Sequence, residues 1–206
     1  MNRVRRNLVI ALSLTPLALA WRGAFAQQRD GFTELNPPQP VETSGKIEVL
    51  EFFWYGCIHC YNLEPRLETW LKSKPADVEF RRVPAVLSDR WGHDAAIFYT
   101  FEALGVLDKV HRPFFDAIHR DRLNTSNVPA LNAWLEKNGI DPKKFDAAAR
   151  SFGVQSKVKR AIRLTTDYKI DGTPMMAVQG RYTIPSSDVM LGTVNQLVAA
   201  VRKNKQ

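Results

Sequence analysis

Two cysteines separated by two residues are the strongest sign of chemistry in this sequence. The chain has only Cys57 and Cys60, within the tetrapeptide Cys57-Ile58-His59-Cys60. A disulfide between residues so close in sequence closes a very short loop, so it constrains the unfolded chain little and stabilises a fold poorly. Reversible thiol–disulfide exchange explains this pair better than a structural role does.

The predicted reactivity of the pair depends on its place at the start of a helix. An apolar stripe over residues 63–71 predicts a helix that begins at or near Cys57. A cysteine in the first turn meets unpaired backbone N–H groups and the positive end of the helix dipole, and both favour the thiolate. His59 can add a hydrogen bond or a positive charge. We therefore predict that Cys57 is the nucleophile and that Cys60, one turn later, is its more buried resolving partner.

Two other uses of the cysteines remain open at this point. A Cys-x-x-Cys motif can form half of a zinc site, but the chain has no second pair, and His93, His111 and His119 lack the spacing of zinc ligands. A purely structural disulfide is the other alternative. Neither explains the residues around the motif, so we expect redox chemistry without a metal.

Glu51 and the segment around Pro174 are candidate partners of the cysteines. Glu51 lies within an apolar strand six residues before Cys57. It is either solvated at the strand end or buried near the cysteines, where its pKa would be raised and it could handle the Cys60 proton. Thr173-Pro174 directly precedes another strand, which indicates a turn or an unusual peptide bond.

The pattern of the chain predicts β-α-β, then a helical block, then β-β-α. The segment 46–55 has apolar residues at both parities, as a central strand covered on both faces requires. The predicted elements are a short strand near 32–35, the strand 46–55, a helix from Cys57 kinked at Pro65, a strand at 78–83, helices throughout 88–152, a helix at 155–168, a hairpin of strands 175–178 and 181–184, and a helix from about Ser187.

The first 26 residues have the order of a secretory signal peptide. Arginines at the start precede an apolar run of about 13 residues, too short to span a bilayer, and then Ala24-Phe25-Ala26. Cleavage after Ala26 leaves 180 residues with 25 basic and 21 acidic side chains. An uncleaved anchor is the alternative, and the sequence does not distinguish Sec from twin-arginine export.

The positive charge of the chain does not predict nucleic-acid binding. Basic residues cluster at Lys157, Lys159, Arg160 and Arg163 on an expected helix. A solvated helix face explains this cluster, and an exported protein rarely meets nucleic acid.

The segment Glu51-Phe52-Phe53-Trp54-Tyr55-Gly56-Cys57-Ile58-His59-Cys60 resembles the active-site strand and helix start of the DsbA family of periplasmic dithiol oxidases. The order of elements is similar to that family over essentially the whole mature chain. The resemblance implies an α/β thioredoxin fold with an inserted helical domain. It divides the chain into a thioredoxin-like domain, 27–87 and 154–206, and an inserted domain, 88–153.

The resemblance also implies a role for each matched residue. Cys57 and Cys60 form the redox-active disulfide, and His59 stabilises the Cys57 thiolate. Glu51 matches the buried acid of the family. Ile58 and the Thr173-Pro174 loop, which matches a cis-proline loop, contact the substrate. Family members commonly have Pro where this chain has Ile58, and Val where it has Thr173, which makes the potential and substrate range uncertain.

The expected activity is thus oxidation of dithiols in reduced or unfolded exported proteins by a periplasmic monomer. No organic cofactor or metal is required. The resemblance implies reoxidation by a quinone-linked membrane partner of the DsbB type. The rival within the same chemistry is an exported reductase or isomerase, since Thr before the cis-proline is similar to the isomerases of that compartment. The rival from another class is a chaperone or metal-binding module.

Overall fold

The computed structural model describes residues 31–204, so the predicted signal peptide and its cleavage site lie outside the described residues. No helix within 31–204 is long and apolar enough to cross a membrane. The elements are β1 (Thr33–Glu34), β2 (Ile47–Phe53), α1 (Ile58–Ser73), β3 (Val78–Pro84), α2 (Asp89–Ala103), α3 (Leu107–His119), α4 (Val128–Lys137), α5 (Pro142–Ala149), α6 (Phe152–Asp167), β4 (Met175–Val178), β5 (Tyr182–Pro185) and α7 (Met190–Lys203).

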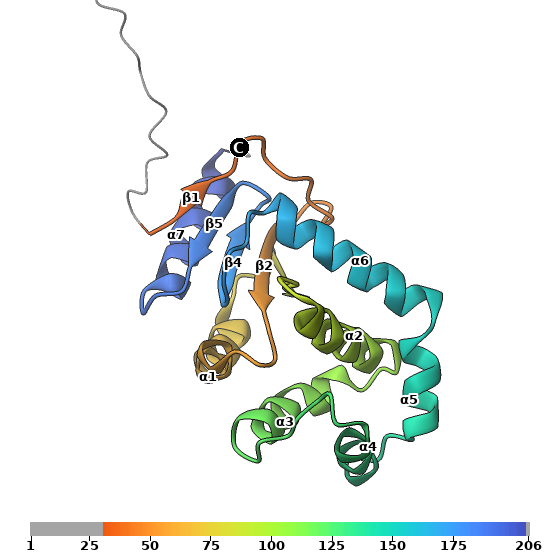
Figure 1. Ribbon diagram of the computed structural model, residues 1–206. Helices are drawn as coiled ribbons and strands as arrows, with labels where there is room; N and C mark the ends of the chain where they lie inside the picture. Colours follow the sequence, from red (N-terminus) through yellow and green to blue (C-terminus); the bar gives the residue numbers. More distant parts are fainter. Residues whose placement is uncertain (1–30, 205–206) are drawn as a thin grey trace, which may run out of the picture.

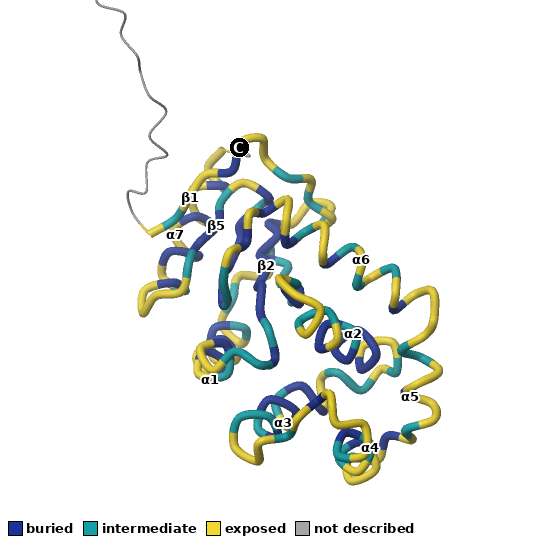
Figure 2. The backbone as a smooth tube through the Cα atoms, viewed as in Figure 1, coloured by how far each residue is buried: buried dark blue, intermediate teal, exposed yellow. Residues whose placement is uncertain are grey.

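The five strands form one mixed sheet in the order β1-β5-β4-β2-β3 (Figure 1). β2 is central: it pairs with β3 in parallel, across the α1 crossover, and with β4 in antiparallel. All seven residues of β2 are buried, as its run of apolar residues at both parities predicts (Figure 2). The Gln179-Gly180 hairpin turn has positive φ at both residues, and a Cβ on Gly180 would lie 2.0 Å from the Gln39 carbonyl oxygen, so only glycine fits there.

Apolar side chains pack against both faces of the sheet. α1 and α7 cover one face, where Val49 of β2 meets Leu67 and Val198. α2, α6 and the remaining helices cover the other face, around Phe52 and Phe114. Each residue of β2 therefore points into one of two cores, and Glu51 has the same parity as Val49, on the α1 face.

The predicted element order is confirmed, with shifted ends. α6 begins at Phe152 instead of residue 155, capped by the Ser151 side chain, which accepts from the Val154 N–H. α7 begins at Met190 instead of about Ser187. α1 continues through Pro65 as one helix. The proposed domain boundary between 153 and 154 falls within the first turn of α6, and the division of the chain into two domains stays a prediction.

Candidate active site

Cys57 is the N-cap residue of α1, and Cys60 lies one turn inside the helix. Gly56 ends the extended segment of β2, and the crossover to α1 begins immediately, so β2 delivers Cys57 to the helix N-terminus. Both cysteines are free thiols; Cys57 is half-buried and Cys60 is fully buried. The first turn of α1 contains no acidic residue that would oppose a thiolate. The predicted exposure difference between the two sulfurs is confirmed.

Hydrogen bonds lower the pKa of the Cys57 thiol to about 5. The largest contribution is a hydrogen bond from the Cys60 thiol, which outweighs the partial burial of Cys57. The Thr173 side chain and the backbone N–H groups of Cys60 and His59 add further donors. A thiolate at a helix N-terminus with this many donors is the dominant form at neutral pH.

The pKa of Cys60 is raised well above the ordinary value of a thiol. Burial is the main cause, and the nearby sulfur of Cys57 and the charge of Glu51 act in the same direction. The two sulfurs therefore differ in acidity although they are three residues apart. Cys57 is suited to attack and to leave as a thiolate, whereas Cys60 needs a proton when it leaves.

Glu51 is fully buried beside the cysteines, which decides between the two alternatives left open by the sequence. Its Oε2 lies 3.1 Å from Arg82 Nε without the geometry of a hydrogen bond. Burial raises the pKa of Glu51 to about 8; the charge of Arg82 opposes this rise, and the charge of Glu64 adds to it. At neutral pH this carboxyl group is mainly protonated and can donate a proton.

Arg82 is shared between two buried carboxyl groups, and Glu64 holds it more firmly. Arg82 Nη2 donates to Glu64 Oε2 at 3.0 Å. Burial acts to raise the pKa of Glu64, but the hydrogen bond from His111 and the charge of Arg82 outweigh it, and the pKa is lowered. Glu64 is therefore the ionised partner of Arg82, which leaves Glu51 free to remain protonated.

The polar chain continues from Glu64 to His111 and Tyr55. His111 Nε2 lies 3.5 Å from Glu64 Oε1, and its Nδ1 lies 2.9 Å from the Tyr55 hydroxyl. Burial lowers the pKa of His111, so the ring is neutral at neutral pH. The α1 face of the active site is thus lined by coupled ionisable groups instead of apolar side chains alone.

The peptide bond between Thr173 and Pro174 is cis, as the family resemblance implies. β4 starts at Met175, which pairs with Phe52 of β2, so the sheet register carries this loop to the cysteines. Cys57 Sγ lies 3.2 Å from the Thr173 carbonyl oxygen. The loop therefore faces the nucleophile with a backbone acceptor and a side-chain donor.

The Thr173 side chain gives a first testable prediction. In Thr173→Val the hydrogen bond that helps to lower the pKa of Cys57 is lost, while the shape of the side chain is kept. Because Cys57 is half-exposed, we expect its pKa to rise by only about one pH unit, less than a fully buried charge-assisted bond gives. Thiolate absorbance across a pH titration of the reduced protein measures this rise. An unchanged titration curve contradicts the role assigned to Thr173.

His59 and Ile58 occupy the exposed side of the helix start. The Ile58 side chain is 47% exposed, so it is available to a substrate. The His59 ring is exposed and makes no hydrogen bond or ion pair with any residue in 31–204, while its backbone N–H contributes to lowering the pKa of Cys57. A role for the imidazole itself, and substrate contact by Ile58 and Pro174, stay predictions.

Three members of the site were missed by the sequence reasoning. Arg82 pairs directly with Glu51 in the parallel β2–β3 register, and Glu64 and His111 complete the polar chain. An arginine inside a predicted buried strand was the available signal for Arg82. His111 belongs to α3, and only tertiary packing brings it to α1.

Comparison with known proteins agrees with this geometry. Residues 93–197 match the model of the DSBA-like thioredoxin domain. The thiol:disulfide interchange protein DsbA of Burkholderia cepacia is 40% identical over 184 residues, which cover 88% of this chain and 86% of that protein. This chain belongs to the DsbA family. The DsbA of Pseudomonas aeruginosa is 37% identical over 183 residues, covering 86% of this chain and 85% of the relative.

Solved DsbA structures share the fold as well as the sequence. The crystal structure of Pseudomonas aeruginosa DsbA superimposes with a TM-score of 0.78 at 33% identity, covering 85% of this chain and 94% of that one. The Xylella fastidiosa oxidoreductase DsbA gives a TM-score of 0.79 at 29% identity, with coverages of 84% and 96%. The predicted thioredoxin fold with a helical insertion is confirmed, and this DsbA-family protein is a thiol:disulfide oxidoreductase.

Proposed function

We propose that this DsbA-family protein works as a dithiol oxidase that introduces disulfides into exported proteins. The observation that carries the proposal is the low pKa of Cys57, about 5, at the start of α1. A stabilised thiolate favours the reduced form of the enzyme. The Cys57–Cys60 disulfide is correspondingly a strong oxidant, because its reduction yields that thiolate.

The first step opens the enzyme disulfide. A substrate thiolate attacks Cys57 Sγ, the more accessible sulfur, and a substrate–Cys57 bond forms as the Cys57–Cys60 bond breaks. The electron pair leaves on Cys60, which is buried and whose pKa is raised. Glu51, with its raised pKa, donates the proton that converts Cys60 to a thiol. The carboxylate left behind is balanced by Arg82.

The second step releases the oxidised substrate. A second substrate thiolate attacks the substrate sulfur of the mixed disulfide, the substrate disulfide forms, and Cys57 leaves as its stabilised thiolate. Two electrons have moved from the substrate dithiol to Cys57 and Cys60. The Thr173-Pro174 loop supports an extended substrate during this exchange by backbone hydrogen bonding beside the nucleophile.

The cellular setting follows from the family and from the sequence of the first 26 residues. We place the mature protein in the periplasm, after cleavage following Ala26, as a monomer that accepts reduced or unfolded proteins. A quinone-linked membrane oxidoreductase of the DsbB type restores the disulfide. Neither step above requires a metal or an organic cofactor.

The redox potential of the mature protein tests the direction of the reaction. Equilibration with glutathione buffers, followed by quantification of the two thiols, gives the potential directly. We expect a value more oxidising than about −180 mV, which is typical of a disulfide isomerase. A DsbA potential of about −120 mV is one of the benchmarks of this scale and does not come from the present geometry. A potential near the thioredoxin value of about −270 mV selects the reductase alternative.

A further inference from the structure

Trp54, which precedes the active-site motif, touches both cysteines through its backbone. The Cys57 N–H donates to the Trp54 carbonyl oxygen at 2.9 Å. Burial is the main cause of the raised pKa of Cys60, and a hydrogen bond with the Trp54 backbone opposes it. A displacement of Trp54 therefore moves a contact of each sulfur-bearing residue.

The Trp54 side chain is held by a buried carboxylate of the helical block formed by α2–α5. Its Nε1–H donates to Asp94 Oδ2 at 2.7 Å, and the Asp94 side chain is 2% exposed. The Thr125 hydroxyl donates to Asp94 Oδ1 at 2.6 Å, and Arg90 Nε lies 3.5 Å from Oδ2. A buried carboxylate is costly unless it is paired and hydrogen-bonded. Trp54 is the donor that reaches Asp94 from the active-site segment.

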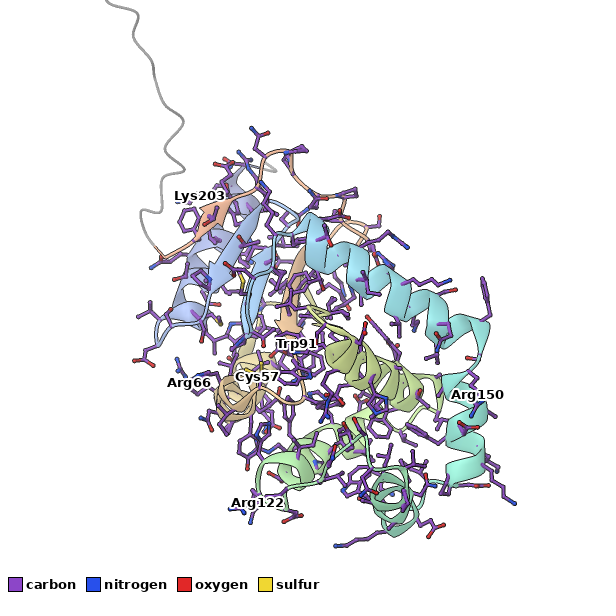
Figure 3. All side chains as sticks on the ribbon, in the orientation of Figure 1. Cys57, Arg66, Trp91, Arg122, Arg150 and Lys203 are labelled. Atoms are coloured by element: carbon purple, nitrogen blue, oxygen red, sulfur yellow. The ribbon has the colours of Figure 1, made fainter. Side chains whose placement is uncertain are left out.

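The indole ring is also fixed by close packing. It stacks on Trp91 of α2, with ring centroids 4.4 Å apart and planes 10° from parallel. A Cβ on Gly56 would lie 2.3 Å from Cζ2 of Trp54, so the backbone just before Cys57 rests against this ring and only glycine allows it. Figure 3 labels Cys57 at the start of α1 and Trp91 on α2, the two elements that this packing connects.

We propose that Asp94 is a positioning residue that sets the redox properties of the Cys57–Cys60 pair through Trp54. The helical block then does more than cover the sheet: its buried carboxylate fixes the indole, the indole fixes the Gly56 backbone, and that backbone places the start of α1. Hydrogen bonds to a thiolate depend on this placement. The proposal deepens the proposed function and rests on Cys57 and Cys60 being redox-active.

A coupled pair of substitutions tests the proposal on the full mature protein. The variants are Asp94→Ala, Trp54→Phe, which keeps an aromatic ring but has no Nε1–H, and the double variant. We expect each single substitution to raise the pKa of Cys57 and to change the equilibrium constant with glutathione about three- to tenfold, the size of one hydrogen bond. Because both break the same contact, the double variant should match the single variants instead of adding their effects.

Thr125→Val is the matched control, since it removes another donor to the same carboxylate without touching the active-site segment. We expect it to lower the melting temperature and to leave the pKa of Cys57 and the glutathione constant unchanged. If Asp94→Ala behaves like this control, or if the effects of Asp94→Ala and Trp54→Phe add, Asp94 does not act through Trp54.

Two provisions keep the test decisive. Should Asp94→Ala fail to fold, Asp94→Asn keeps the size of the side chain and one oxygen acceptor, and Trp54→Phe alone still carries the test. Unchanged redox constants in Trp54→Phe then overturn the proposal. A reducing potential in the unsubstituted protein contradicts the oxidase direction but leaves the coupling measurable, whereas equal constants in all variants contradict the coupling alone.

Discussion

Replacing Cys57 with serine abolishes dithiol oxidation by this protein. A serine hydroxyl cannot form the internal disulfide that a substrate thiolate attacks, and the remaining sulfur, Cys60, is buried with a raised pKa. Oxidation of a reduced two-cysteine peptide, followed by mass spectrometry after treatment of the variant with oxidant, should proceed only at the background rate. Substantial oxidase turnover by Cys57→Ser contradicts the mechanism.

Cys60→Ala is the informative companion of this variant. It also lacks the internal disulfide, so it should not turn over either. It retains an accessible thiol whose pKa has lost one contribution, the hydrogen bond from Cys60, and therefore rises from about 5. A mixed disulfide formed at Cys57 has no resolving partner in this variant, so it should accumulate on non-reducing gels, whereas Cys57→Ser should form none.

The strongest features of the site were predictable because they follow from local rules. A cysteine that ends a strand and opens an amphipathic helix must meet the free N–H groups of the first turn, and Cys57 does so. The apolar run of β2 likewise predicts a central strand. The burial of Glu51 was not decided by the run itself, because an acid near a strand end can equally face solvent.

The partners of Glu51 could not be predicted with the same confidence, for a physical reason. The pairing of Glu51 with Arg82 depends on the register of two parallel strands separated by α1. Neighbouring positions in β3 are also occupied by arginine, and Arg81 pairs with Glu48 on the opposite face of the sheet. A register shift by one residue would exchange the two arginines.

The contact between Trp54 and Asp94 shows the same limit at longer range. Forty residues separate these side chains, and their contact requires α2 to fold back onto the segment between β2 and α1. The sequence indicates that α2 exists but not which of its faces meets the active site. A polar residue buried in a helix of the inserted block becomes meaningful only when its donor is known.

Arg82→Met destabilises the folded protein by about 3–5 kcal/mol at pH 7, the cost typical of breaking a buried ion pair by removing one partner. Arg82 lies 3.1 Å from Glu51 and 3.0 Å from Glu64, and its side chain is 19% exposed. Methionine fills part of the volume but leaves two buried carboxyl groups without a cation. Urea unfolding of the reduced variant, monitored by tryptophan fluorescence, measures the loss.

The loss should depend on pH in a defined direction. The pKa of Glu51 is already raised, to about 8, from an ordinary value of 4.5, so this group favours the folded state most below 4.5 and progressively less as the pH rises to about 8. The pKa of Glu64 is lowered, so in the unsubstituted protein it adds stability above its ordinary value that is lost in acid. Without Arg82 that contribution of Glu64 disappears. The deficit of Arg82→Met should therefore be largest near pH 8 and shrink toward pH 4.5.

A surface arginine separates this effect from a general loss of charge. Arg181 pairs with Glu34 at 2.8 Å on the exposed edge of the sheet, and both side chains are about half-exposed. Because solvent screens such pairs, Arg181→Met should change stability little and without a comparable slope between pH 4.5 and pH 8. If Arg82→Met and Arg181→Met unfold at the same urea concentration across this range, Arg82 does not stabilise the buried carboxyl groups beside Cys60. Glu51 must then keep its proton by burial alone.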